Sequence, residues 1–275
     1  MEPPALVALR ERVRAESKLL VAFSGGADSA LLVAVAAAEL GDAALAVTAV
    51  SPSLAAAERS AARAFAREQR ARHLEVCTDE LDRPEYTRND GDRCYHCKSA
   101  LFDALEPIAA LAGARIALGT NTDDLGDHRP GLRAAAARGA IAPLVDAGLS
   151  KADVRAASAA LRLPTAAKPA AACLSSRVAY GEPVTAEVLA HVEAAEEVLR
   201  AQGFAGFRVR SHGGGTVARI EVAEADLPRL LEVRAAVEAG VRAAGFRFCA
   251  VDLAGFRSGR MNVLLGMPAP LGAPT

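Results

Sequence analysis

An apolar run at residues 19–23 is followed by six small and polar residues, Ser24-Gly25-Gly26-Ala27-Asp28-Ser29, and then by a second apolar run. This order predicts a strand, a tight turn and a helix that begins near Ser29. The two glycines allow a sharp turn that brings backbone N–H groups close to an anion, and the N-terminus of the helix directs unpaired N–H groups to the same point. The chain is therefore predicted to be an α/β protein that holds a phosphate group at a strand end.

The residue types in this turn limit the kinds of phosphate ligand that it could bind. Ser24 and Ser29 add hydroxyl donors, whereas a carboxylate such as Asp28 beside a polyanion indicates a bound Mg²⁺ or a donor network. The turn matches neither the Walker loop, which ends in Gly-Lys-Ser/Thr, nor the Gly-x-Gly-x-x-Gly loop. The alternative is a strand-to-helix turn that is rich in Ser and Gly for structural reasons.

The composition indicates a soluble globular protein, because 52% of the 275 residues are hydrophobic and 24% are charged. The net charge of −1 argues against a polyanion such as tRNA as the main partner. The N-terminal residues lack the apolar core of a signal peptide, and the longest apolar run, at residues 30–38, is too short to span a membrane. We therefore expect a cytoplasmic protein with no membrane or nucleic-acid partner, whose five cysteines are metal ligands or reactive thiols.

Short apolar runs alternate with amphipathic stretches up to Pro164, which is typical of βαβ units around a parallel sheet. One helix is predicted to follow Ser53 as its N-cap, and another to begin at Ser150 with a capping box that includes Asp153. Residues 1–165 are thus predicted to form a doubly wound, mostly parallel α/β domain. Its strands are expected at residues 19–23, 45–50, 73–76 and 115–119.

A second, smaller α+β domain is predicted at residues 185–267, after a loop or linker at residues 166–184. Three glycines at residues 213–215 separate two alternating runs, which is typical of a hairpin. The tail at residues 268–275 is expected to be poorly ordered. The elements expected in the second domain are helices at 186–201 and 226–243 and strands at 207–211, 217–222 and 246–253.

Two cysteines, Cys94 and Cys97, lie in a polar stretch that is predicted to be a loop leading into a helix near Lys98. A lone Cys-x-x-Cys is consistent with a zinc half-site, a redox pair or chance. Zinc would need two more ligands, for which Cys173 and either His96 or His128 are candidates. Three cysteines with one vacant position suit a [4Fe–4S] cluster better than a closed zinc site.

The remaining cysteines, Cys77 and Cys249, lie in apolar, strand-like runs and are predicted to be small core residues. Cys173 instead precedes Ser175, Ser176 and Arg177 in a polar loop. This basic and hydroxyl-rich setting favours a thiolate.

A polar loop follows the fourth predicted strand, and it contains Gly119, Asn121, Asp124 and Arg129. In a doubly wound sheet the C-terminal strand ends line the ligand crevice, so we expect this loop to face the turn at residues 24–29. Its carboxylates would hold Mg²⁺ and its arginine would contact phosphate. An ordinary Asp/Asn-rich turn is the alternative.

Arg208, Arg210 and His212 share one face of a predicted strand in the second domain. Arg257 and Arg260 follow the last strand, which we expect to lie beside it. Together these side chains would bind a phosphate or carboxylate that does not belong to ATP. A solvated basic face is the alternative.

Taken together, these motifs resemble the LarE family, and they extend from about residue 20 to residue 262. They are the Ser-Gly-Gly-x-Asp-Ser turn at residues 24–29, Cys94-x-x-Cys97 with Lys98, Gly119-Thr120-Asn121 with Asp124, Arg129-Pro130-Gly131-Leu132, Lys168-Pro169, Cys173-Leu174-Ser175-Ser176-Arg177, Tyr180-Gly181, Arg208-Val209-Arg210 and Gly255-Phe256-Arg257-Ser258-Gly259-Arg260-Met261-Asn262.

The resemblance implies a PP-loop ATP pyrophosphatase fold, of the adenine nucleotide alpha hydrolase type, that uses ATP and Mg²⁺. It implies an enzyme that adenylates the carboxylates of pyridinium-3,5-biscarboxylic acid mononucleotide, releases pyrophosphate and forms thiocarboxylates for a nickel-pincer nucleotide cofactor. It makes Asp28, Cys173, Ser176 and Arg177 the expected catalytic residues, and the arginines of the second domain the expected site of the substrate phosphate. It also implies a homohexamer built from trimers.

The family supplies sulfur in two ways, either from a sacrificial cysteine or from a sulfide on a [4Fe–4S] cluster held by three cysteines. Aligned on the Ser175-Ser176-Arg177 motif, the sacrificial cysteine falls at Ala172, one residue before Cys173. The resemblance therefore favours the cluster type, with Cys94, Cys97 and Cys173 as ligands, and it does not identify the sulfide donor. Sacrificial donation by Cys173, a PP-loop tRNA thiolase and a non-catalytic nucleotide-binding module stay open as alternatives.

Overall fold

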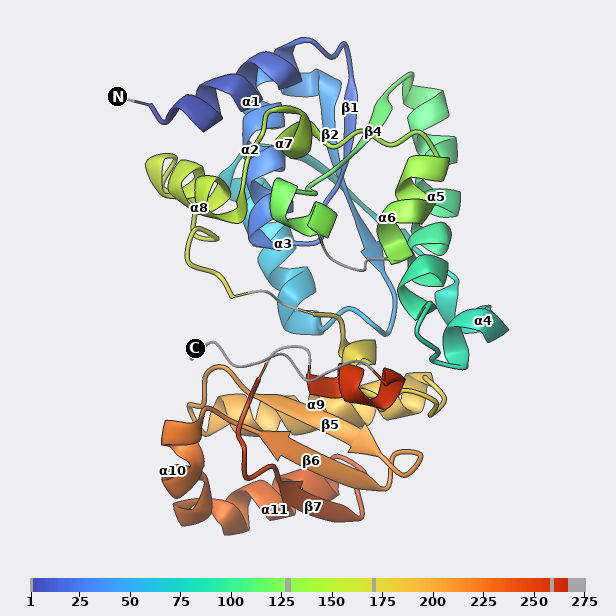
Figure 1. The fold of residues 1–275 in the computed structure, drawn as a ribbon, viewed down its shortest axis with the longest axis vertical. Helices are drawn as coiled ribbons and strands as arrows, with labels where there is room; N and C mark the ends of the chain where they lie inside the picture. The colour runs from blue at the N-terminus through green and yellow to red at the C-terminus, as the bar shows by residue number, and fades with distance from the viewer. Residues whose placement is uncertain (1, 127–129, 170–171, 258–259, 267–275) are drawn as a thin grey trace. The chain divides into compact units, whose positions relative to one another are not determined.

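The computed structural model describes residues 2–126, 130–169, 172–257 and 260–266 (Figure 1). Its contacts divide the chain into two compact units. The first unit comprises Met1–Glu80 and Cys94–Ala171, and the second comprises Leu81–Arg93 and Ala172–Thr275. The predicted tail at residues 268–275 lies outside the described residues.

The first unit is built on a parallel four-stranded sheet with the order β3-β2-β1-β4. The strands are β1 (Leu19–Ala22), β2 (Ala44–Val50), β3 (Arg72–Cys77) and β4 (Arg115–Leu118), which confirms the predicted α/β sheet. The helices of this unit are α1 (Pro4–Arg14), α2 (Ala27–Leu40), α3 (Ala56–Glu68), α5 (Arg93–Ala112), α6 (Pro130–Ala137), α7 (Pro143–Asp146) and α8 (Lys151–Ala160). The first residue of α5, Arg93, is assigned to the second unit.

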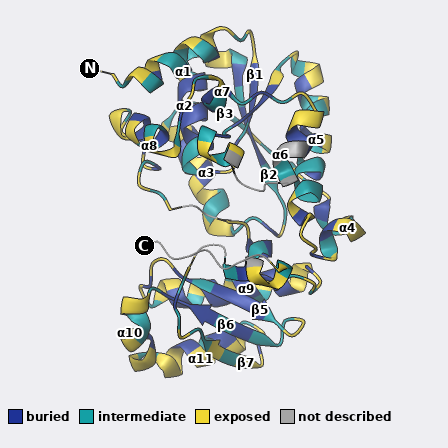
Figure 2. Cartoon of the chain, viewed as in Figure 1, coloured by how far each residue is buried: buried dark blue, intermediate teal, exposed yellow. Residues whose placement is uncertain are grey.

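Both faces of this sheet are covered. Leu19 and Val21 of β1 pack with side chains of α1, α2, α3 and α8, whereas Leu20 packs with Phe102 and Leu105 of α5. Alternate residues of a strand point to opposite faces, so a strand buried on both faces is apolar throughout. That is why β1 is a continuous hydrophobic run, drawn as buried in Figure 2.

Two predicted helix starts have different outcomes. Ser150 forms the predicted capping box, since its side chain accepts from the Asp153 N–H at 3.2 Å and the Asp153 carboxylate accepts from the Ser150 N–H at 3.0 Å. The prediction for Ser53 was wrong, because α3 begins at Ala56. Ser53 is buried in a turn, where its N–H donates to the Ser51 hydroxyl at 3.2 Å.

The second unit contains a three-stranded sheet with the order β5-β6-β7. The predicted hairpin is confirmed, since β5 (Arg208–His212) pairs antiparallel with β6 (Val217–Glu221), and β7 (Phe248–Val251) pairs parallel with β6. The helices of this unit are α4 (Pro84–Thr87), α9 (Ala186–Ala201), α10 (Leu227–Glu232) and α11 (Arg234–Ala243). None of the helices in the described parts of the chain has both the length and the apolar character of a membrane span.

The single helix predicted at residues 226–243 was wrong, because it is interrupted at Val233, which lies between α10 and α11. No Gly or Pro lies at this break, where Val233 takes a φ of −95° and a ψ of 11°, outside the helical region. Leu230 of α10 and Val237 and Val241 of α11 are buried on the two sides of the break.

The two compact units also differ from the predicted domain boundaries, because the segment Leu81–Arg93 belongs to the second unit. Asn89 is fully buried, and its side-chain amide donates to the backbone carbonyls of Ala179 at 2.8 Å and Glu182 at 3.0 Å. Tyr86 contributes a hydrogen bond of 2.6 Å between its hydroxyl and that of Ser175. These contacts join segments distant in sequence.

Candidate functional site

Side chains of the turn between β1 and α2 form hydrogen bonds with each other and with its backbone. The Ser24 and Ser29 hydroxyl oxygens lie 3.1 Å apart, and the Ser29 hydroxyl donates to the Gly26 carbonyl at 3.1 Å. Gly25 has a φ of +76°, a conformation that favours glycine. No side chain caps the N-terminus of α2, whose N-cap is Gly26. The turn therefore presents backbone donors, as an anion site requires.

The loop after β4 contacts this turn. The Asn121 side-chain amide donates to the Asp28 carboxylate at 2.9 Å, and the Asn121 N–H donates to the Asp124 carboxylate at 3.2 Å. The structure thus brings together two predicted nucleotide-binding segments that are distant in sequence. Arg129 and His128 lie outside the described residues.

Gly119 is the point at which the two segments approach most closely. A Cβ atom at this position would lie 2.6 Å from the Ser29 backbone nitrogen and 2.9 Å from the Asp28 carbonyl carbon. Backbone atoms of the turn cannot move aside without changing the anion site. Only glycine fits between β4 and the N-terminus of α2.

Gly119→Ala should therefore lower the free energy of unfolding by about 1–3 kcal/mol, the usual effect of overpacking. Gly91→Ala is the control, because a Cβ at Gly91 would meet only the Leu265 side chain at 3.5 Å, an ordinary contact. Urea denaturation of both variants measures the difference. Equal stabilities would show that the turn tolerates a side chain at Gly119.

Lys168 is a further neighbour of the turn, and it was recognised in the sequence only as part of a motif. Its ammonium group donates to the Gly25 carbonyl at 2.9 Å and to the Glu58 carboxylate at 2.6 Å. Glu58 lies in the first turn of α3 and was not a predicted site residue. No local signal in the sequence connects these residues.

Cys94 and Cys97 are the second and fifth residues of α5, which begins at Arg93, so the loop predicted there was wrong. The helix starts earlier because the Arg93 N–H bonds to the Asp90 carbonyl and its buried side chain donates to the Ser175 carbonyl at 2.9 Å. Residues three apart lie on the same helix face, which brings the two thiols side by side. Cys94 is exposed and Cys97 is half-buried.

Desolvation lowers the pKa of the Lys98 ammonium, and the thiols of Cys97 and Cys94 partly oppose that shift. Of the two predicted core cysteines, Cys77 is exposed at the end of the edge strand β3, so that prediction was wrong. Cys249 is half-buried in β7. Burial raises the pKa of the Cys249 thiol.

The donor set for a cluster consists of three thiols. Cys94 and Cys97 belong to the first unit, and Cys173, which is exposed, belongs to the second. Within the described residues the structure gathers no group of three or more His, Cys, Asp or Glu side chains for a metal. Thiolates are the ligands that iron–sulfur clusters use, so the donor chemistry fits while the assignment stays a prediction.

The backbone of Cys173 is held by Ser176 and Arg177. Its carbonyl accepts from the Ser176 hydroxyl at 2.7 Å and from the Arg177 guanidinium at 2.9 Å. Arg177 is buried, forms an ion pair with the buried Glu196 at 2.9 Å and also donates to the Ala172 carbonyl at 2.6 Å. These contacts give Arg177 and Ser176 the geometry of residues that position Cys173.

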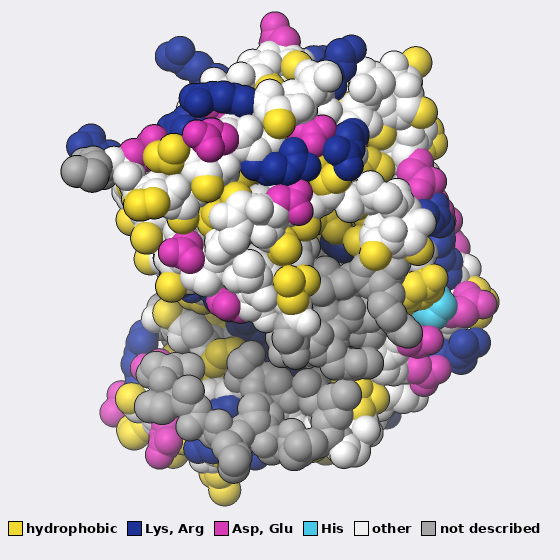
Figure 3. Space-filling view, turned by 45° about the horizontal axis from the view of Figure 1, so that its top comes forward, with side chains coloured by type: hydrophobic (Ala, Val, Ile, Leu, Met, Phe, Trp, Pro, Cys, Tyr) yellow, Lys and Arg dark blue, Asp and Glu magenta, His cyan; other side chains and the backbone are white. Residues whose placement is uncertain are grey.

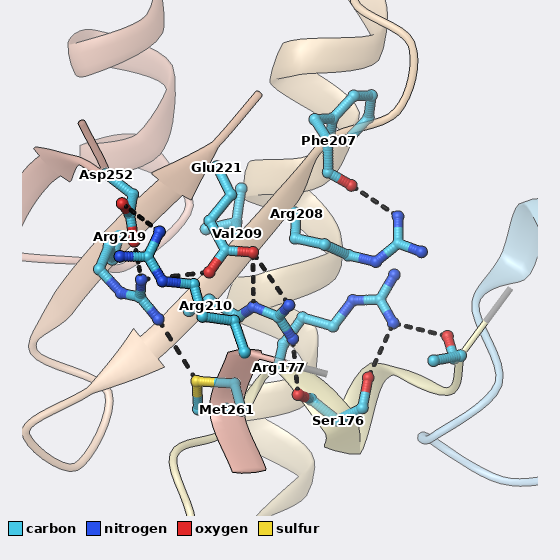
Figure 4. Close-up of polar contacts among 12 residues, drawn as sticks. Ser176, Arg177, Phe207, Arg208, Val209, Arg210, Arg219, Glu221, Asp252 and Met261 are labelled. Atoms are coloured by element: carbon cyan, nitrogen blue, oxygen red, sulfur yellow. Dashed lines mark hydrogen bonds and ion pairs between the residues drawn. The ribbon is translucent and has the colours of Figure 1, made fainter. Parts of the chain in front are cut away.

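The predicted arginine cluster lies beside this loop in the second unit (Figure 4). Arg210 is buried, forms an ion pair with Glu221 at 2.9 Å and donates to the Ser176 carbonyl at 2.9 Å. The guanidinium of Arg208 points toward that of Arg177 and lies 4.9 Å from the centre of the Phe256 ring. Burial and the charge of Arg177 lower the pKa of Arg208 to about 10. An anion at this point would relieve that repulsion.

Arg219, which the sequence reasoning missed, is the register partner of Arg210 on β6. It forms ion pairs with Glu221 at 3.1 Å and with Asp252, and its Nε donates to His212 Nε2 at 3.1 Å. Asp252 in turn accepts from Arg260 at 2.8 Å. The residues that bind Arg219 come from both β5 and the end of β7.

The cluster differs from the predicted one in its topology. The last strand, β7, lies beside β6 and not beside β5, so the expected adjacency was wrong. Arg260 reaches the cluster through Asp252, whereas Arg257 is exposed and Ser258 and Gly259 lie outside the described residues. Burial and Arg219 lower the pKa of His212, consistent with a neutral imidazole that accepts a hydrogen bond.

Comparison with known proteins gives a family match to part of the chain and relatives that match about nine-tenths of it. The model of the asparagine synthase family matches residues 7–88, which include β1, the turn and α2. An uncharacterized protein of Synechocystis sp. is 42% identical over 251 residues, which are 90% of this chain and 93% of that protein.

Two further relatives have a similar length. The pyridinium-3,5-bisthiocarboxylic acid mononucleotide synthase of Lactiplantibacillus plantarum is 38% identical over 247 residues, 89% of each chain. An uncharacterized protein of Methanocaldococcus jannaschii is 26% identical over 251 residues, 91% of this chain and 94% of that protein. The similarity therefore includes both structural units.

Proposed function

Since the chain belongs to the LarE family of pyridinium-3,5-bisthiocarboxylic acid mononucleotide synthases, we propose that it converts the carboxylates of pyridinium-3,5-biscarboxylic acid mononucleotide to thiocarboxylates. ATP activates each carboxylate, and sulfur then replaces one of its oxygens. The observation that carries this proposal is the hydrogen bond of Asn121 to Asp28, which joins the two nucleotide-binding segments.

Activation is needed because a carboxylate is a poor electrophile. A substrate carboxylate oxygen attacks the α-phosphorus of ATP, and the bond from this phosphorus to the bridging oxygen breaks to release pyrophosphate. The backbone N–H groups of the turn at residues 24–29 hold the polyphosphate, and Asn121 orients Asp28 beside it. Asp28 and Asp124 would hold Mg²⁺, which would neutralise the charge that develops on pyrophosphate.

The second half of the reaction needs a sulfur nucleophile. Cys94, Cys97 and Cys173 would hold a [4Fe–4S] cluster, which when bound would supply an exchangeable sulfide. AMP leaves from the acyl-adenylate as the carbon–sulfur bond forms. Arg177 and Ser176 hold the Cys173 backbone in place, a positioning role that their contacts with its carbonyl support.

The phosphate of the mononucleotide is proposed to bind at the arginine cluster of the second unit. Arg210 and Arg260 contact carboxylates, and Arg208 donates to the Phe207 carbonyl at 2.6 Å, stacks on the Phe256 ring and points toward the guanidinium of Arg177. A dianionic phosphate would offset the repulsion between the guanidinium groups of Arg208 and Arg177. Arg210 and Arg260 complete the positive surroundings, and the exposed Arg257 adds a further cation from the same segment.

A small nucleotide is favoured over tRNA by the net charge of −1. On the face drawn in Figure 3, Lys and Arg side chains lie among Asp and Glu side chains. Nucleic-acid binding uses an uninterrupted basic patch and produces a strong salt dependence. A salt-dependent shift of tRNA in a gel would favour the thiolase alternative.

Arg208→Ala should weaken binding of the mononucleotide by roughly tenfold to a hundredfold, because one charge-assisted hydrogen bond is worth about 1.5–3 kcal/mol. Binding of ATP should stay the same. Arg242→Ala, on the exposed side of α11, is the matched control. Isothermal titration calorimetry with each ligand measures both effects, and equal losses for the two ligands would contradict a separate phosphate site.

The proposed function is tested by pyrophosphate release in the presence and absence of the mononucleotide. Release that requires the mononucleotide, together with oxygen-to-sulfur exchange detected by mass spectrometry of the product, is the expected result. Binding of ATP without any release in the presence of the authentic substrate would instead indicate a nucleotide-binding module.

A further inference from the structure

The contacts of Lys168 suggest a role for a residue outside the proposed catalytic set. Its ammonium group donates to the carbonyl of Gly25, in the middle of the phosphate-binding turn, at 2.9 Å. The same group pairs with Glu58 at 2.6 Å. A cation at this point suits a polyphosphate, but the carboxylate beside it does not.

Glu58 is close to the turn as well as to Lys168. One of its carboxylate oxygens lies 3.9 Å from the position that a Cβ atom on Gly25 would occupy. A polyphosphate in the turn would thus be attracted by Lys168 and repelled by Glu58. The carboxylate competes with the phosphate for the same ammonium group.

The ion pair between Lys168 and Glu58 is weak enough for a phosphate to replace the Glu58 carboxylate. The side chains of Lys168 and Glu58 are 20% and 30% exposed, and partly exposed pairs contribute at most about 1 kcal/mol. A charge-assisted bond from lysine to a multiply charged phosphate is stronger. The exchange needs only a change of side-chain rotamers.

The backbone at Lys168 has its own support. Arg155 of α8 donates to the carbonyls of Ala166 at 3.1 Å and Lys168 at 3.4 Å. The Lys168 side chain can therefore change partners while its backbone stays in place. In sequence, Lys168 shortly precedes Ala172, the first residue of the segment that carries Cys173.

We propose that Lys168 exchanges Glu58 for the terminal phosphates of a bound nucleoside triphosphate, and that Glu58 holds the lysine in the empty site and lowers nucleotide affinity. Lys168 is then a positioning residue for pyrophosphate. This inference rests on the proposed function only in taking ATP as the ligand. It assigns opposite effects to the two partners of one ion pair.

The test is calorimetric binding of Mg²⁺ with α,β-methylene-ATP, which cannot be cleaved at the reacting bond. Lys168→Met should weaken binding by about tenfold or more, and Glu58→Gln should tighten it by roughly threefold. The double variant should bind more weakly than Glu58→Gln, because it lacks the ammonium group. Inorganic pyrophosphate should show the same pattern, whereas the affinity for AMP should stay within about twofold of the unmodified protein, because AMP lacks the terminal phosphates.

Lys151→Met on α8 and Glu68→Gln on α3 replace exposed residues of the same types and should leave binding unchanged. Thermal melting confirms that each variant folds. Weaker binding in both single variants, or no change in either, would show a static ion pair and overturn this inference alone. Absence of nucleotide binding by the unmodified protein would overturn it together with the proposed function.

Discussion

Asp28→Ala should abolish pyrophosphate release, with a loss of at least roughly a thousandfold, and leave the fold intact. The carboxylate accepts a hydrogen bond from Asn121 at 2.9 Å, so it lies between the turn and the loop after β4. Its removal takes away both this link and a proposed ligand of Mg²⁺. Loss of one preorganised charged group at a transition state typically costs about a hundredfold to a thousandfold, and loss of the metal adds to it.

The measurement is pyrophosphate formation with the mononucleotide at saturating ATP, accompanied by circular dichroism of the variant. Asp42→Ala is the control, because Asp42 is an exposed acidic residue at the opposite end of α2. Asp28→Asn retains the hydrogen-bonding shape without the charge and should also be inactive. Unchanged turnover in Asp28→Ala would show that the turn does not hold the reacting nucleotide.

Replacement of any one of Cys94, Cys97 and Cys173 by Ala should remove most of the iron and the brown absorbance of anaerobically purified protein. A cluster held by three thiolates loses a third of its protein ligands with each substitution. Sulfur transfer should fall in parallel. Pyrophosphate release should persist, because the segments proposed to bind the nucleotide do not include these residues.

Cys77→Ala is a matched control, since Cys77 is also exposed but is not a proposed ligand. Iron and sulfide analysis of all four variants distinguishes the two sources of sulfur. If only Cys173→Ala is inactive, no iron is bound and the unmodified protein loses one sulfur atom during turnover, the sacrificial route is correct.

Much of the fold was predictable because its strands are local patterns. Strands β1, β2 and β4 are short, mostly apolar runs, and burial of β1 on both faces requires such a run whatever surrounds it. The capping box at Ser150 is equally local, since both of its hydrogen bonds join residues three apart. The predicted start of α3 was wrong because Ser53 enters a turn with Ser51, and both choices satisfy a backbone N–H.

Other errors arose where distant residues decide the outcome. α5 begins at Arg93 because that side chain is buried against Ser175, which is 82 residues away. Cys77 is exposed because β3 is an edge strand, a position that depends on the order of strands in the sheet. Apolar neighbours in sequence do not distinguish an edge strand from a central strand of the sheet.

The turn at residues 24–29 is the part of this protein that the sequence by itself determined, together with the strand before it and the helix after it. Glycine conformation, hydroxyl donors and a helix N-terminus are local properties, so residue types suffice. The tertiary structure alone decided what surrounds the turn. Asn121 reaches Asp28 across 93 residues and Lys168 reaches Glu58 across 110, and such contacts exist only once parallel strand ends have been brought to the same edge.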